Sequence, residues 1–143
     1  MKKLSILIGL VICTVAYDIG ALFVGSSAGR SPLAPSISPN KTVEGLIGGC
    51  VAAILAGILI HLAGMYPWGG SGTKFIHAFQ LGVVVAIAAP IGDLVESKVK
   101  RDLGVKDMGT LLPGHGGVLD RFDAFLFVLP AVYYLCRVLN VGI

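Results

Sequence analysis

The sequence predicts an all-α, polytopic integral membrane protein with about four transmembrane helices in a single domain, residues 1–143. Two observations favour this fold class. First, 55% of the residues are hydrophobic, the mean hydropathy is +0.88 and only 13% are charged, whereas a typical soluble domain has about 25% charged residues. Second, apolar stretches of about 20 residues, the length of a membrane-crossing helix, occur four times.

The four expected spans are residues 4–25, 46–64, 75–95 and 122–141. The first also resembles a signal peptide, but its apolar character resumes past Asp18, which a signal core does not need. The second is rich in Gly and Ala, which favours close contact between helices. The third contains Pro90 and the fourth contains Pro130. Proline is tolerated in a span when neighbouring helices satisfy the freed carbonyl groups.

The distribution of charge places the first and third connections in the cytoplasm and both chain ends outside it. These connections hold most of the bases, as the positive-inside rule requires, although Lys2 and Lys3 favour the opposite orientation. All eight acids lie in the same connections or in the adjoining span ends: Asp18, Glu44, Asp93, Glu96, Asp102, Asp107, Asp120 and Asp123. Because acids contribute little to topology, their asymmetry predicts a polar site open to the cytoplasm.

Two other classes of site are disfavoured. The three cysteines form no tight ligand cluster of the kind that zinc requires. The net charge of +3 is modest and no basic cluster is interleaved with aromatic residues. We therefore expect no nucleic-acid partner.

The end of the third span, "GDLVESKVKRD", places charged residues on one helical face. Asp93, Glu96, Ser97, Lys100 and Arg101 follow one another at helical spacing. Lys100 and Arg101 are also explained as bases that extend from a helix end to the membrane surface. That alternative explains Asp93 poorly, because aspartate is too short to reach the surface.

At the start of the fourth span, Asp120 and Asp123 lie one turn apart. Together with Asp93 they predict a site of carboxylate oxygens suited to Mg²⁺, which keeps waters and phosphate oxygens as its other ligands. We expect Asp93 and Asp120 to face each other, with Asp123 close behind and Lys100 within reach of a phosphate. The alternative for Asp120 is a helix N-cap, a position that aspartate favours.

The two cytoplasmic connections supply further candidates. In the third connection, Lys106 and the glycines of "PGHGG" can approach an anion, and His115 is an acid or base, a phosphate donor or a turn residue. In the first connection, "SPNKTVEG", Lys41 is either a phosphate contact or a base in a solvated turn, and Thr42 is placed to cap the second span. Asp18 lies well inside a span and is not expected to face lipid.

Two stretches of the chain carry a resemblance to a known family. The string "SKVKRDLGVKDMGTLLPGHGGVLDRFD", residues 97–123, closely resembles the signature of phosphatidate cytidylyltransferases, also called CDP-diacylglycerol synthases. The string "YDIGALFVGSSAGRSPLAPSISPNKTVEGLIGG" is similar to a second stretch of that family. The resemblance covers nearly the whole chain and corresponds to the C-terminal catalytic half of typical members, which have further helices before the equivalent of Leu4.

The resemblance implies a Mg²⁺-dependent nucleotidyltransferase that moves CMP from CTP to phosphatidate, giving CDP-diacylglycerol and pyrophosphate in phospholipid biosynthesis. A second cation such as K⁺ is compatible with such a site. The catalytic residues are then Asp93, Asp120, Lys100 and Asp123, and the metal ligands are Asp93, Asp120 and Asp123. The substrate-binding residues are Asp18, Ser38, Lys41, Glu96, Ser97, Arg101, Lys106, Asp107, His115, Gly116, Gly117 and Arg121.

The expected partners are CTP, phosphatidate and the lipid bilayer, and the expected location is the bacterial inner membrane, with the site facing the cytoplasm. Two alternatives stay open. One is another CTP-dependent membrane enzyme, such as a polyprenol kinase or an archaeal-type lipid cytidylyltransferase. The other is a non-catalytic half that requires a partner subunit. The short chain leaves room for a homodimer or for a partner that supplies the missing amino-terminal helices.

Overall fold

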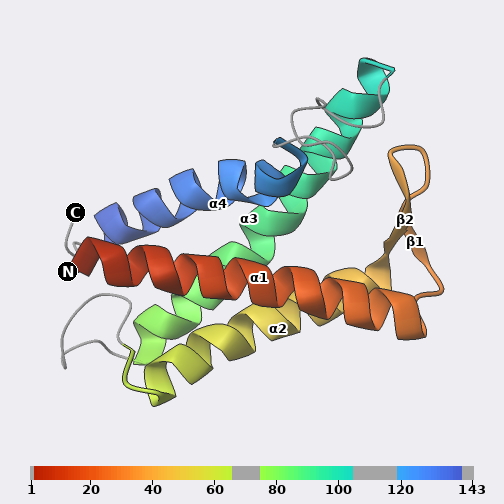
Figure 1. Cartoon of the computed structure of the whole chain (residues 1–143). Helices are drawn as coiled ribbons and strands as arrows, with labels where there is room; N and C mark the ends of the chain where they lie inside the picture. Colours follow the sequence, from red (N-terminus) through yellow and green to blue (C-terminus); the bar gives the residue numbers. More distant parts are fainter. Residues whose placement is uncertain (1, 66–74, 105–118, 140–143) are drawn as a thin grey trace.

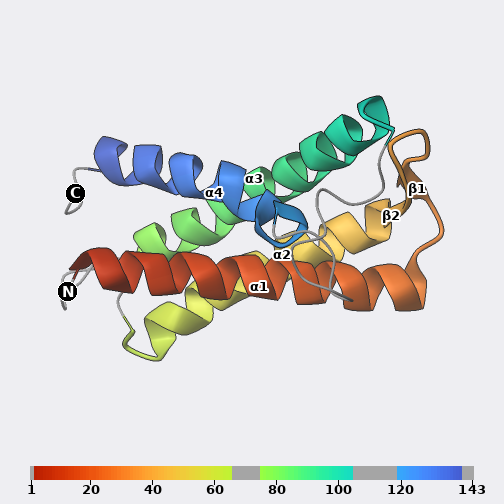
Figure 2. The same ribbon diagram turned by 45° about the horizontal axis from the view of Figure 1, so that its top comes forward.

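The structure, a computed structural model, describes residues 2–65, 75–104 and 119–139. Four helices form a bundle in which each packs against the next along the chain (Figure 1). In chain order the elements are α1 (Lys2–Ala28), β1 (Pro32–Ala34), β2 (Ser38–Thr42), α2 (Val43–Leu62), α3 (Phe75–Asp102) and α4 (Leu119–Val138). The start of α1 and the end of α4 lie at one end of the bundle, and the β1–β2 hairpin lies at the other (Figures 1 and 2).

The all-α, polytopic membrane fold class is confirmed. Three helices in the described part of the chain are long and apolar enough to cross a bilayer: Leu4–Ala28, Val43–Leu62 and Phe75–Asp102. The apolar stretch found in the fourth helix, Ala124–Val138, is shorter. The helix itself, Leu119–Val138, has 20 residues, as α2 does, but within it only the side chains from residue 124 onward are described. The structure thus has a helix at each of the four expected spans.

Close contacts between helices depend on small residues, as the Gly- and Ala-rich second span predicts. A Cβ atom on Gly57 of α2 would lie 2.6 Å from the carbonyl oxygen of Ala78 in α3. A Cβ atom on Gly82 of α3 would lie 2.7 Å from the Cα atom of Ile54 in α2. Only glycine allows the two backbones to approach this closely. The largest fully buried side chains of the surrounding core are Leu10, Leu81, Val85, Val128, Thr14, Cys13 and Cys136.

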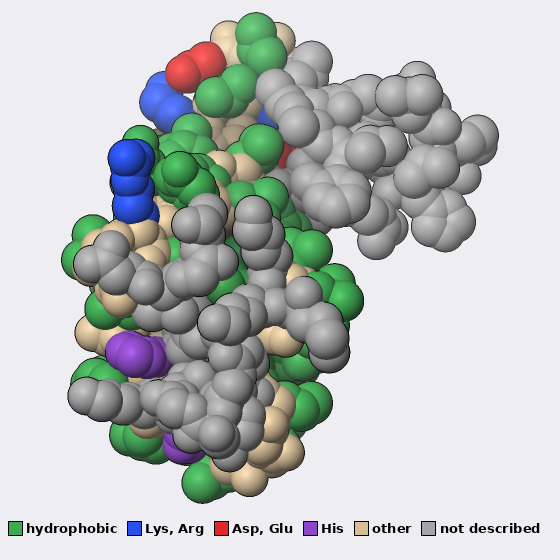
Figure 3. Space-filling view, turned by 90° about the vertical axis from the view of Figure 1, so that its left-hand side faces the viewer, with side chains coloured by type: hydrophobic (Ala, Val, Ile, Leu, Met, Phe, Trp, Pro, Cys, Tyr) green, Lys and Arg blue, Asp and Glu red, His purple; other side chains and the backbone are tan. Residues whose placement is uncertain are grey.

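The outer surface of the helices suits lipid. Large hydrophobic side chains are widely exposed along the helices, among them Leu22 (74%), Phe23 (72%) and Leu59 (61%). Seen from the end where α1 begins, hydrophobic side chains cover much of the described surface, and the charged ones gather toward one edge (Figure 3). An apolar surface of this extent is the one expected of helices that contact hydrocarbon.

The first connection contains a feature that the sequence does not predict. Its strands β1 and β2 form an antiparallel hairpin in which Pro32 pairs with Thr42 and Ala34 pairs with Ser38, with an irregular register between them. Thr42 ends the hairpin and begins α2, since its hydroxyl accepts a hydrogen bond from the backbone N–H of Gly45 at 3.1 Å. The predicted cap at Thr42 is therefore confirmed.

Candidate active site

A cavity of about 340 Å³ lies at the hairpin end of the bundle. It is enclosed by one face of α1, by the hairpin, by the start of α2 and by one residue of α3. The residues that line it are Tyr17, Asp18, Ala21, Leu22, Gly25, Ser26, Leu33, Asn40, Lys41, Thr42, Gly45, Leu46 and Asp93. Three of the predicted site residues, Asp18, Lys41 and Asp93, thus meet in one place although they are distant in sequence.

Lys41 and Asp93 form an ion pair at this cavity. Lys41 comes from β2 and Asp93 from the middle of α3, and their side chains are 26% and 33% exposed. The Lys41 ammonium nitrogen itself is buried, and its contact with Asp93 is an ion pair rather than a well-aligned hydrogen bond. Charges withdrawn from water in this way are costly unless they are paired. The pair therefore fixes the hairpin against α3.

The predicted charged face of α3 exists, and the structure shows how it is used. The helix continues without a break through Pro90 to Asp102, so Asp93 and the later charged residues share one helix. Lys100 pairs with Glu96 one turn earlier at 2.9 Å, and the Glu96 side chain is only 6% exposed. The Nε–H of Arg101 donates to the carbonyl oxygen of Ile37 in the hairpin at 3.1 Å. Both bases that were expected to bind phosphate thus have protein partners.

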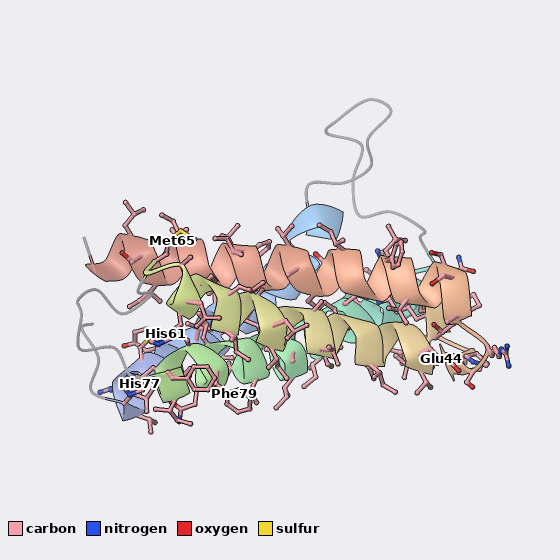
Figure 4. All side chains as sticks on the ribbon, turned by 90° about the horizontal axis from the view of Figure 1, so that it is seen from below. Glu44, His61, Met65, His77 and Phe79 are labelled. Carbon is pink, nitrogen blue, oxygen red and sulfur yellow. The ribbon has the colours of Figure 1, made fainter. Side chains whose placement is uncertain are left out.

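Glu44 holds the other side of the hairpin. Its carboxylate oxygen Oε2 accepts hydrogen bonds from the backbone N–H groups of Arg30 and Ser31, each at 3.1 Å. It lies at the hairpin end of the bundle, whereas His61 and His77 lie at the opposite end (Figure 4). Sequence reasoning did not select Glu44, although an acid in the first turn of a helix is a recognised signal for nearby N–H donors.

Other predicted residues fall outside this cavity or outside the described part of the chain. Ser38 begins β2 but does not line the cavity, and Ser97 lies on α3 beyond it. Five candidates lie in residues 105–118, which are not described: Lys106, Asp107, His115, Gly116 and Gly117. Asp120, Arg121 and Asp123 lie within the first five residues of α4, but their side chains are outside the described set.

The expected approach of Asp93 to Asp120 therefore stays a prediction. The helices that carry these two residues, α3 and α4, do pack against each other (Figures 1 and 2). Within residues 2–65, 75–104 and 124–139, no group of three or more His, Cys, Asp or Glu side chains could hold a metal ion.

Sequence reasoning also missed Tyr17 and Asn40, both of which line the cavity. Tyr17 is 5% exposed and precedes Asp18 on α1. A tyrosine next to an aspartate inside an apolar helix is a usable signal, because buried tyrosines place their hydroxyl group near polar partners.

A comparison of the chain with models of known protein families shows to which family it belongs. The model described as the cytidylyltransferase family matches residues 2–139, which include every element and the whole cavity. The chain belongs to the cytidylyltransferase family. The residues that line the cavity at the hairpin end all lie within the part of the chain that matches this family.

Individual members of this family match the chain as well. The chain is 46% identical over 125 residues to the phosphatidate cytidylyltransferase of Bacillus subtilis. The aligned region covers 86% of the chain and 45% of that relative. The chain is 50% identical over 119 residues to the Mycobacterium leprae enzyme of the same name, covering 82% and 36%. It is 46% identical over 123 residues to the Synechocystis enzyme of that name, covering 85% and 40%. The chain thus spans less than half the length of these curated relatives.

Proposed function

We propose that this chain is the catalytic part of an enzyme that transfers CMP from CTP to phosphatidate, giving CDP-diacylglycerol and pyrophosphate for phospholipid biosynthesis. The observation that carries the proposal is the identity of 46–50% with relatives named phosphatidate cytidylyltransferase, over more than four fifths of the chain. The cavity supports it, because Lys41, which can meet a phosphate group, and two carboxylates, which can hold a cation, lie there beside apolar helix faces that suit a lipid.

In the proposed reaction, an oxygen of the phosphatidate phosphate attacks the α-phosphorus of CTP. The bond from the α-phosphorus to the oxygen that bridges to the β-phosphorus breaks, and pyrophosphate leaves with the bonding electrons. Several negative charges must be held together for this step, so catalysis consists mainly of positioning and charge stabilisation. Lys41 lies at the cavity, where its ammonium group can stabilise this negative charge. Lys100 lies about 10 Å beyond Asp93 along α3 and can stabilise negative charge there.

Mg²⁺ is the proposed cofactor, with Asp93, Asp120 and Asp123 as its ligands and K⁺ as a candidate second cation. The residues fit this role, because Mg²⁺ needs only one or two protein carboxylates when substrate phosphates and waters complete its shell. Asp93 offers a half-buried carboxylate at the cavity, held in place by Lys41. When bound, Mg²⁺ supplies a Lewis acid that neutralises charge on the α-phosphate.

The proposed orientation places the hairpin end on the cytoplasmic side of a bacterial inner membrane, where CTP is available. Five bases, Arg30, Lys41, Lys98, Lys100 and Arg101, belong to the hairpin or to the adjoining ends of the helices, whereas Lys2, Lys3 and Arg137 belong to the helix ends opposite the hairpin. This arrangement agrees with the positive-inside rule. A homodimer, or a complex with a partner subunit, is the proposed assembly.

A direct assay tests the proposed function. The purified chain is incubated with radiolabelled CTP and Mg²⁺, with and without phosphatidate, alone and together with the unmatched part of the Bacillus subtilis relative. Labelled CDP-diacylglycerol that depends on phosphatidate is the expected product. If ATP is consumed instead and a free lipid alcohol becomes phosphorylated, the chain is a lipid kinase. If neither product forms in any combination, the catalytic role is wrong.

A further inference from the structure

The β1–β2 hairpin is poorly equipped to hold its own position. Its strands have three and five residues with an irregular register, and Pro32, Pro35 and Pro39 supply no N–H donor. A two-stranded hairpin by itself is at best marginally stable in water. Because Lys41 belongs to β2, its position relative to α3 depends on the contacts that hold the hairpin.

Two described contacts join the hairpin to α3. In the turn between the strands, the carbonyl oxygen of Ile37 accepts a hydrogen bond from the Nε–H of Arg101. On β2, Lys41 forms its ion pair with Asp93. Neither contact acts where the chain leaves α1 to enter the hairpin and leaves the hairpin to enter α2.

Three hydrogen bonds close the foot of the hairpin, which consists of Arg30, Ser31, Val43 and Glu44. The Oε2 atom of Glu44 accepts the N–H groups of Arg30 and Ser31 at 3.1 Å each. The carbonyl oxygen of Ser31 accepts the N–H group of Val43 at 2.9 Å. The charge of Glu44 suits this position, because an acid is favoured in the first turn of a helix and a charged acceptor strengthens both of its hydrogen bonds.

In the proposed reaction, the Lys41–Asp93 ion pair cannot be the permanent anchor of the hairpin. Lys41 would meet a substrate phosphate and Asp93 would hold a cation, so each group would share or exchange its partner during turnover. A hairpin held only by this pair would shift whenever the pair loosens. Glu44 does not line the cavity and bonds to backbone groups, so its contacts can persist while substrates bind and leave.

We propose that Glu44 is a positioning residue, which holds the hairpin at its foot so that Lys41 keeps its place against α3 through each catalytic cycle. The assignment rests on the proposed function, because it gives Lys41 a part in the transfer reaction. Glu44 touches no substrate in this role and acts only through the hairpin. Its loss should therefore let the hairpin move and lower turnover, while the helical bundle stays folded.

Pulsed electron paramagnetic resonance measures the position of the hairpin without relying on turnover. Nitroxide labels are attached at Ser36→Cys, in the exposed turn of the hairpin, and at Leu62→Cys, which ends α2 and is 71% exposed. The native cysteines are replaced by alanine. The labels lie roughly 30 Å apart or more, because α2 alone extends about 30 Å.

Glu44→Ala removes the acceptor and is expected to broaden the distribution of label distances by about twofold or more, because both charge-assisted hydrogen bonds are lost. Glu44→Gln keeps a neutral acceptor of the same shape and should broaden the distribution less. Asp102→Ala is the matched control, because Asp102 is an acid whose ion-pair partner, Lys98, lies on the same helix. It should leave the distribution unchanged.

Turnover of radiolabelled CTP provides the second measurement. Glu44→Ala is expected to lower turnover about tenfold or more, because small displacements of a positioned group are costly in catalysis. If Glu44 acts through Lys41, adding Glu44→Ala to Lys41→Met should cost little more than Lys41→Met alone, whereas an unrelated structural effect would add to it.

An unchanged distance distribution in Glu44→Ala would overturn the proposal, and so would additive losses in the double variant. If Glu44→Ala does not fold, Glu44→Gln decides in its place, and a distribution as narrow as that of Asp102→Ala would overturn the proposal. Labelled CDP-diacylglycerol together with an unchanged distribution removes the positioning role alone. A broadened distribution without product from any chain removes the proposed function alone, because the anchoring of the hairpin is measured separately.

Discussion

The Lys41–Asp93 ion pair connects a strand residue to a helix residue at the cavity of the hairpin end. Both side chains are about one third exposed or less, so each charge is partly withdrawn from water. Removing one partner would leave the other without compensation in a site of low polarity, which is costly. A substitution that keeps the shape of the side chain therefore separates the role of charge from the role of structure.

Asp93→Asn is expected to lower the formation of CDP-diacylglycerol by at least about a hundredfold, because a neutral amide stabilises neither a cation nor the neighbouring ammonium. The amide keeps the volume of the side chain, so the variant should stay folded in detergent. Turnover is measured with radiolabelled CTP in nanodiscs. Asp102→Asn is the matched control, since Asp102 lies on the same helix with its side chain 61% exposed. Near-normal turnover of Asp93→Asn would show that Asp93 acts only as a structural partner of Lys41.

Asp120→Asn distinguishes the two interpretations of Asp120. Helix α4 begins at Leu119, so Asp120 lies in its first turn. As a metal ligand, Asp120 is expected to be as sensitive as Asp93, with a loss of about a hundredfold or more in turnover. As an N-cap, it would tolerate the change, because asparagine caps helices as well as aspartate does. Turnover and the thermal unfolding of both variants are compared in the same detergent.

Residues on one helix were easier to predict than residues brought together by the fold. The spacing from Asp93 to Arg101 predicted one helical face correctly, and the i, i+4 spacing of Glu96 and Lys100 also signals their ion pair. The bond from Arg101 to Ile37 joins residues 64 positions apart. The sequence alone does not reveal that bond or the Lys41–Asp93 pair, because both depend on where the hairpin lies against α3.

Among the elements, hydropathy predicted the helices but not the hairpin. A long apolar segment that crosses a membrane forms a helix, because every backbone N–H and C=O group must find a hydrogen-bond partner inside the lipid. The hairpin has no alternating apolar pattern and contains Pro32, Pro35 and Pro39, which are typical of a loop. It is held instead by contacts from α2 and α3, through Glu44 and Arg101.

Gly57→Ala tests whether the α2–α3 contact determines helix packing. In an isolated helix this change would stabilise by about 1 kcal/mol. Here the added methyl group would lie 2.6 Å from the carbonyl oxygen of Ala78, so the helices must separate. We expect the free energy of unfolding to fall by about 1–3 kcal/mol, measured by denaturation in mixed detergent micelles. Leu59→Ala, at a position of α2 that is 61% exposed, is the control and should cost less. Stabilisation by Gly57→Ala would contradict the close contact.

At the scale of the whole molecule, the described acids and most of the described bases gather toward one end of the bundle. The cavity, the hairpin and the charged end of α3 lie together, whereas the opposite end carries His61 and His77 on α2 and α3 (Figure 4) and Arg137 in the last turn of α4. In a membrane this asymmetry bears on both the orientation and the proposed function. The bases favour the cytoplasmic side, and the proposed site for CTP would open to that side as well.

Labelling of single cysteines tests this orientation. Ser36→Cys places a thiol in the exposed turn between β1 and β2, and Met65→Cys places one at the opposite end, where Met65 is 55% exposed (Figure 4). The native Cys13 and Cys136 are buried and Cys50 is half-buried, so they should react slowly. In intact cells, an impermeant maleimide should label Met65→Cys, whereas Ser36→Cys should be labelled only after the inner membrane is opened. Because the two thiols lie at opposite ends of one helical bundle, labelling of both from the outside would contradict the membrane-spanning orientation. Labelling of Ser36→Cys alone would show that the orientation is inverted. The cavity would then face away from the cytoplasm, where CTP is available.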